Sequence, residues 1–132
     1  MEAGDMLYFA NSKSLPPCRL RRDDLRKLVR LMESGFPSDG CISTLHLWAE
    51  QGGAELSADN IEEFLGNARL SRRISALEVV VKCVRGGNAI RDVRLIFGVA
   101  ASRIEVKGEN RDWMDDVPQL VQGFLVTRRP RY

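Results

Sequence analysis

The sequence predicts an α+β fold, a two-layer sandwich in which about three helices cover a mostly antiparallel sheet of five to six strands. The runs 77–84, 90–97 and 103–107 alternate apolar and polar residues, which is typical of half-buried strands. Three other segments repeat apolar residues at i, i+3 and i+4, as helices packed on one side do. Two glycine pairs separate strand-like runs at hairpin spacing. One layer of helices on a sheet buries both kinds of apolar surface.

Length and composition fit a single globular domain over residues 1–132, which would also suit one domain of a longer chain, even one anchored in a membrane. The hydrophobic fraction of 44% and the charged fraction of 29% exclude a disordered chain. The net charge of +2 gives no strong overall field, so any attraction for nucleic acid must come from local clusters. No apolar run reaches the roughly 18 residues of a membrane-spanning helix.

The N-terminus and the cysteines bear on localisation. The first residues are acidic and lack the basic start of a secretory signal. Cys18, Cys41 and Cys83 are odd in number and widely spaced, so they do not form a disulfide framework. We expect reduced thiols, with Cys83 as a small core residue, and an intracellular, cytoplasmic protein.

The first part of the chain predicts an edge strand and a helix. The run 6–10 favours a short strand, and the turn formers and prolines of 11–17 favour a loop. Asp23 stands where the N-cap of the next helix is expected, and Gly35 with Pro37 predicts its end. The apolar residues at helical spacing are Leu25, Leu28, Val29 and Met32.

The run 41–49 predicts a strand with apolar side chains on both faces. Leu45 and Leu47 lie on one face, and Ile42 and Trp48 lie on the other. A strand covered on both sides, or one with a face at an interface, shows this pattern.

A hairpin and a short helix follow. Gly52 and Gly53 predict a turn, and 54–56 the returning strand. Asp59 has capping-box spacing to Glu62, so the helix should open there. Its apolar stripe is Ile61, Phe64 and Leu65.

The remaining chain predicts a three-stranded β-meander and a last helix. Gly86 and Gly87 tolerate the positive φ angles of a tight turn between the first two strands. Acidic residues before Pro118 favour a helix N-terminus near that proline, and the helix should end near Thr127. Its apolar stripe is Val117, Leu120, Val121 and Phe124.

We expect no catalytic, cofactor or metal site. His46 shows neither a nucleophile nor a carboxylate partner in the sequence. Together with the three cysteines it lacks zinc-finger spacing. The glycine pairs lack the lysine and hydroxyl residue of a phosphate-binding loop. An enzyme would have to assemble its site from scattered residues such as His46, Asp92 and Arg94.

Three acidic residues before the last helix, Asp112, Asp115 and Asp116, are the carboxylates that a divalent cation would use. Helix capping explains them more simply.

Arginine clusters are the strongest charged feature. They comprise Arg19, Arg21, Arg22, Arg26, Lys27 and Arg30, then Arg69, Arg72 and Arg73, and finally Arg128, Arg129 and Arg131. Arginines that meet in the fold would bind phosphate oxygens by bidentate contacts, but the acids mixed among them favour solvated helix faces with local ion pairs.

The leading hypothesis is a non-enzymatic interaction or regulatory module. The face that carries Ile42 and Trp48 would bind a protein partner or a second copy of the chain, with arginines adding charge complementarity. The alternative hypothesis is nucleic-acid binding through Arg22, Arg26 and Arg30 of the first helix together with Arg72 and Arg73.

Overall fold

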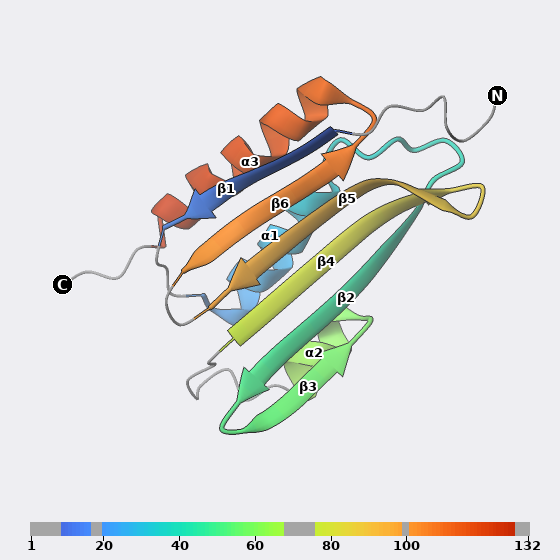
Figure 1. The fold of residues 1–132 in the computed structure, drawn as a ribbon. Coiled ribbons are helices and arrows are strands. Elements are labelled where there is room, and N and C mark those ends of the chain that lie inside the picture. The colour runs from blue at the N-terminus through green and yellow to red at the C-terminus, as the bar shows by residue number, and fades with distance from the viewer. Residues whose placement is uncertain (1–8, 17–19, 68–75, 99–100, 129–132) are drawn as a thin grey trace.

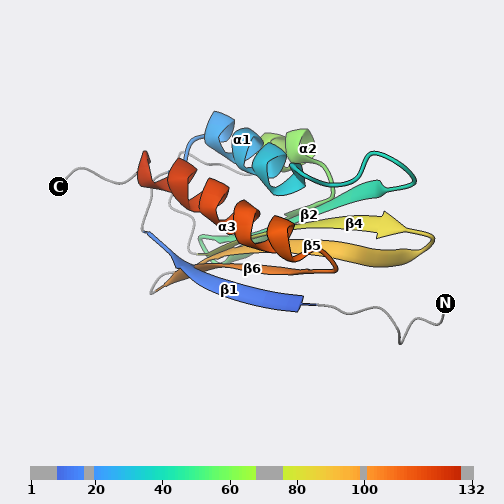
Figure 2. The same cartoon turned by 90° about the horizontal axis from the view of Figure 1, so that it is seen from above.

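A computed structural model describes residues 9–16, 20–67, 76–98 and 101–128. Within these ranges the chain forms one open, antiparallel sheet of six strands and three helices, all on the same face of the sheet (Figures 1 and 2). The predicted α+β sandwich is confirmed. The strands are β1 (Phe9–Leu15), β2 (Ile42–Gln51), β3 (Ala54–Ala58), β4 (Ala76–Arg85), β5 (Asn88–Phe97) and β6 (Ser102–Gly108). The helices are α1 (Arg22–Glu33), α2 (Ile61–Asn67) and α3 (Arg111–Val126).

The strand order is β1-β6-β5-β4-β2-β3. The predicted β4-β5-β6 meander is confirmed at the centre of the sheet, and Gly86 and Gly87 have φ angles of 58° and 81° in its first turn. The β2-β3 hairpin pairs with β4 on one side of the meander, and β1 pairs with β6 on the other.

Strand β1 lies further along the chain than predicted. It reaches Leu15 and so includes most of the segment expected to be a loop. Seven residues of β1 pair with β6, which shows that pairing with an available sheet edge outweighs the weak strand propensity of Asn and Ser. The first part of the predicted strand lies outside the described residues.

Helix α1 begins earlier than Asp23, which was predicted as its cap. Arg21 is the N-cap residue, and its N–H donates to the Asp24 carboxylate at 2.9 Å. The carboxylate therefore acts from the third helical position. The predicted buried stripe and the end of the helix near Gly35 are confirmed.

Helix α2 is capped by Asn60, not by Asp59. The Asn60 side-chain oxygen accepts from the N–H groups of Glu62 and Glu63 at 2.8 and 3.1 Å. Two adjacent residues were chemically able to cap this helix, and the path of the chain out of β3 decides between them.

Helix α3 begins at Arg111, with Asn110 accepting from the Trp113 N–H at 2.9 Å. The predicted start near Pro118 is wrong, because this proline lies inside the helix and is buried. Val117 and Val121 of the predicted stripe are buried, as predicted, but Leu120 is 48% exposed. Trp113 and Leu125, each four residues from a member of the stripe, complete the buried side of the helix. The helix ends at Val126 with Thr127 as its C-cap, which confirms the predicted end near Thr127.

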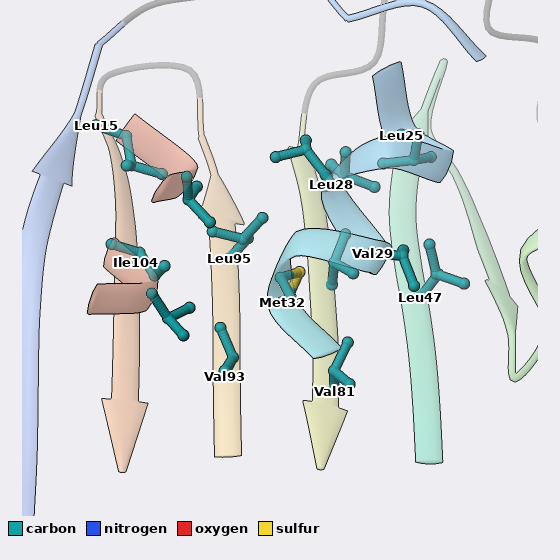
Figure 3. Packing of buried hydrophobic residues seen from close by; sticks show 14 of the residues in the cluster. Leu15, Leu25, Leu28, Val29, Met32, Leu47, Val81, Val93, Leu95 and Ile104 are labelled. Carbon is teal, nitrogen blue, oxygen red and sulfur yellow. The ribbon is translucent and has the colours of Figure 1, made fainter. Parts of the chain in front are cut away.

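The core lies between the helices and one face of the sheet (Figure 3). Leu28 and Met32 of α1 pack beside Val81 and Leu95, all with 0% exposure. The three helices therefore cover only this inner face. The opposite face has no covering layer among the described residues (Figure 2).

Candidate functional site: the open face of the sheet

We use the name open face for the sheet surface opposite the helices. Paired residues of an antiparallel sheet point to the same side, so the register gives three rows of side chains across it. The first row, from β3 to β1, is Ser57, Trp48, Glu78, Ile96, Arg103 and Ser14. The second row is Asp59, His46, Val80, Arg94, Glu105 and Ser12. The third row is Thr44, Lys82, Asp92, Lys107 and Ala10.

The open face carries both of the apolar residues proposed as contacts. Ile42 is 69% exposed, the highest value among the large apolar residues of the described chain, and Trp48 is half-buried. They do not form one cluster, because Thr44 and His46 lie between them on the same side of β2. The apolar surface is therefore divided between two ends of the strand.

Charged pairs occupy much of the remaining open face. Arg94 Nε lies 3.4 Å from Glu78 Oε1, and Arg103 Nε lies 3.1 Å from Glu105 Oε1. The charges are unevenly distributed. The β2-β3 side carries the acids Glu50, Glu55 and Asp59, and the β5-β6 side carries the cations Arg94, Arg103 and Lys107 beside Asp92 and Glu105.

His46 has a carboxylate partner that sequence reasoning missed. Its Nδ1 lies 2.8 Å from Asp59 Oδ1, and both side chains are exposed. An ionised carboxylate only accepts, so this contact requires a proton on Nδ1. The predicted hairpin could have revealed this contact. Its turn pairs Gln51 with Ala54, and counting away from the turn along both strands brings residue 46 opposite residue 59.

A shallow depression of about 560 Å³ surrounds this pair. It is lined by Ser43, Thr44, Leu45, His46, Asp59, Val80 and Lys82. The other residues of the enzyme hypothesis, Asp92 and Arg94, line a separate and much smaller hollow with Glu105 and Lys107. The three residues named for that hypothesis therefore do not converge on one pocket.

The arginines of α1 lie in the helix layer and do not contribute to the open face (Figure 2). The expectation that this cluster adds charge to the face of Ile42 and Trp48 is corrected: arginines of β5 and β6 do so instead. Arg22 and Arg30 are exposed, whereas Arg72 and Arg73 lie outside the described residues.

Arg26 is held by two carboxylates. It makes a bidentate contact with Glu62 at 2.8 and 3.0 Å, and it donates to Asp23 at 2.7 Å. These hydrogen bonds, first the one donated to Glu62 and then the one donated to Asp23, raise the pKa of Arg26, and the contact with Arg26 lowers the pKa of Glu62. A phosphate would have to displace these carboxylates to bind the guanidinium.

Asp24 joins the first arginine cluster to Arg128 of the third. Arg128 Nε donates to Asp24 Oδ1 at 3.0 Å, and its guanidinium lies over the Phe124 ring. Burial raises the pKa of Asp24, but hydrogen bonds from Arg21 and Arg128 outweigh it and the pKa is lowered. The two clusters meet around a carboxylate, so here arginine stabilises the fold.

The described cysteines are in contact: Cys41 directly precedes β2, and Cys83 lies near the end of β4. Burial, and then the hydrogen bond with the Cys41 thiol, raise the pKa of Cys83 to about 11. Cys83 is fully buried, as its predicted core position requires, and Cys41 is half-buried. Cys18 lies outside the described residues.

Across the described ranges, no group of three or more His, Cys, Asp or Glu side chains is arranged to hold a metal ion. Asp112 lies in the first turn of α3, but Asp115 and Asp116 are exposed further along it and do not cap its start. No helix in the described part of the chain is long and apolar enough to cross a membrane.

Comparisons with protein-family models, with curated proteins and with solved structures found no match.

Proposed function

We propose that this chain is a non-catalytic interaction module that binds a protein through the open face. The observation that carries the proposal is the one-sided layering of the fold. All three helices cover the inner face, and they leave the outer side of a six-stranded sheet without a covering layer among the described residues. Exposed faces that combine apolar and polar side chains are typical of protein-binding surfaces.

The chemistry of the open face supports a protein partner. Trp48 offers a large, half-buried aromatic surface, and Ile42 an exposed aliphatic one. The neighbouring strands carry charged groups of both signs, which suit a partner with its own mixed charges. Phosphate oxygens would instead favour an excess of cations.

Site-specific photo-cross-linking in the host cell tests this proposal. A benzophenone amino acid replaces Thr44 or Ser57 on the open face, and in a matched control it replaces Leu120 on the outer side of α3. All three positions are exposed, so the variants should fold. We expect protease-sensitive adducts of defined mass from Thr44 and Ser57 and none from Leu120. The adducts should disappear when Ile42→Glu and Trp48→Glu are added.

Adducts from Leu120 alone, or an absence of adducts from both open-face positions, would contradict the proposal. Nuclease-sensitive adducts would do so as well, and would favour nucleic acid as the ligand.

A further inference from the structure

The size of the open face matches what a stable protein interface needs. Strands of 7 to 10 residues make up most of the sheet. Together with the shorter β3 they form a sheet of six strands. Its face is roughly 25 Å wide and about 23–33 Å long, or roughly 600–800 Å². A standard interface buries about 800 Å² on each partner. One partner with a flat surface of the same dimensions would therefore cover the face completely, and a second copy of the chain has that surface.

The charge pattern decides how two copies would meet. In a symmetric pair, sheets pack face to face about 10 Å apart with their strands roughly aligned. In one such pair the two-fold axis runs parallel to the strands, between β4 and β5. It places β2 of one copy over β6 of the other, and each row of side chains lies over the corresponding row of the partner. The arrangement also places β3 over β1 and β4 over β5, so that the β2-β3 side of one copy lies over β6 and β1 of its partner.

The contacts of this arrangement include a cation opposite an aromatic ring and a pair of opposite charges. In the first row Trp48 faces Arg103 of the other copy, a pairing suited to a cation over an aromatic ring. In the second row His46 faces Glu105.

In the third row, Lys82 of β4 faces Asp92 of β5. Every one of these contacts occurs twice, because the two copies are equivalent.

The other face-to-face arrangement is repulsive. A two-fold axis perpendicular to the strands places each strand over itself with the row order reversed. Asp59 would then face Asp59 and Glu105 would face Glu105 in the middle row, while Arg103 would face Lys107. Like charges at an interface cost affinity and reject the wrong geometry.

We propose that the open face binds a second copy of this chain about a two-fold axis that runs along the strands between β4 and β5. This inference rests on the proposed function, and it specifies the partner and the pairing of residues.

A charge-exchange cycle between His46 and Glu105 tests the inference. Within one chain these residues lie on β2 and β6, separated by β4 and β5, about 14 Å apart across the sheet. They do not touch in the monomer, so any coupling between them reports the contact between copies. The variants are His46→Glu, Glu105→Lys and the two combined. Glu63→Lys, exposed on α2, is the matched control.

Sedimentation equilibrium from micromolar to millimolar protein measures the dimer dissociation constant, and circular dichroism checks that each variant is folded. We expect a dimer that each single open-face change weakens at least tenfold. His46→Glu places a carboxylate opposite Glu105 at both equivalent contacts, and Glu105→Lys removes both carboxylates that face His46. The combined variant should recover most of the loss, and Glu63→Lys should leave the constant unchanged.

A dimer in which the combined variant shows no recovery overturns this arrangement. A monomer at every concentration overturns the inference as a whole. If open-face cross-links in the cell then join the chain to a different protein, the proposed function stands without it; if they are absent too, both fall.

Discussion

Arg91 of β5 lies over the ring of Trp113 at the start of α3, with its guanidinium carbon 5.2 Å from the ring centroid. Both side chains are at least nine-tenths buried. Arg91 also donates to the Gly35 carbonyl and to Glu109, so one cation ties the turn after α1 to the turn before α3. The indole is enclosed on two further sides by the backbone of Gly35 and Gly108.

Gly108→Ala should destabilise the protein because the new Cβ would lie 2.8 Å from the buried Trp113 ring. Forcing the indole to move should lower the free energy of unfolding by about 1–3 kcal/mol. Urea denaturation measures this. The matched control is Gly123→Ala, inside α3, where a new Cβ would meet no atom within 4 Å. It should stabilise by up to about 1 kcal/mol, and equal losses in both variants would argue against the enclosed indole.

The Trp113 site shows what local sequence patterns can and cannot predict. The sequence places Trp113 directly before an amphipathic segment, where a large apolar side chain can pack against the helix. The contacts that enclose it come from positions 35, 91 and 108, which meet only after the sheet and both helices have formed. Stripes within α1 and alternation within the meander are local, and they were predicted correctly.

Helix ends were harder to predict than helix faces. Asp23 and Asp59 have the right chemistry for caps, but neither caps its helix. At the start of α1 the Asp24 carboxylate accepts from the Arg21 N–H, and at the start of α2 the Asn60 side chain accepts from the Glu62 N–H. The direction in which the preceding chain arrives decides such cases. The open face was also predictable only in part. The sequence assigned Ile42 and Trp48 to one side of a strand, but the residues beside them in each row could be identified only from the strand order.

Asp24→Asn should make the protein less sensitive to acid. The folded-state pKa of Asp24 is below its ordinary value of 3.8, so its ionised form stabilises the fold above about pH 4–5. That contribution is lost as the pH falls through the folded-state pKa. The variant should lose about 1 kcal/mol at pH 7, where a cap and the Arg128 contact are weakened.

Urea denaturation at pH 7 and at steps down to pH 2.5 measures the effect. The difference in the free energy of unfolding between wild type and Asp24→Asn should shrink with acidification. Asp116→Asn, which removes an exposed carboxylate of α3, controls for net charge. A constant difference at every pH would mean that the ionisation of Asp24 is not coupled to folding.

Cys83 should resist alkylation in the native state. Burial, together with the neighbouring Cys41 thiol, raises its pKa to about 11, so the thiolate that reacts with iodoacetamide is scarce at pH 8. Peptide mass spectrometry should find Cys41 modified first and Cys83 modified only after denaturant is added. Labelling of both at the same rate in native buffer would show that the end of β4 opens readily.

The two faces of β2 should respond differently to truncation. Leu47 is fully buried against the helices, so Leu47→Ala should lower the free energy of unfolding by about 2–5 kcal/mol. Ile42 points to the open face and is 69% exposed, so Ile42→Ala should change monomer stability by no more than about 0.5 kcal/mol. Urea denaturation at micromolar and submicromolar protein separates the monomer from any dimer. A loss for Ile42→Ala that grows with protein concentration would show that the side chain is buried by association, whereas an equally large loss at every concentration would place it in the monomer's own core.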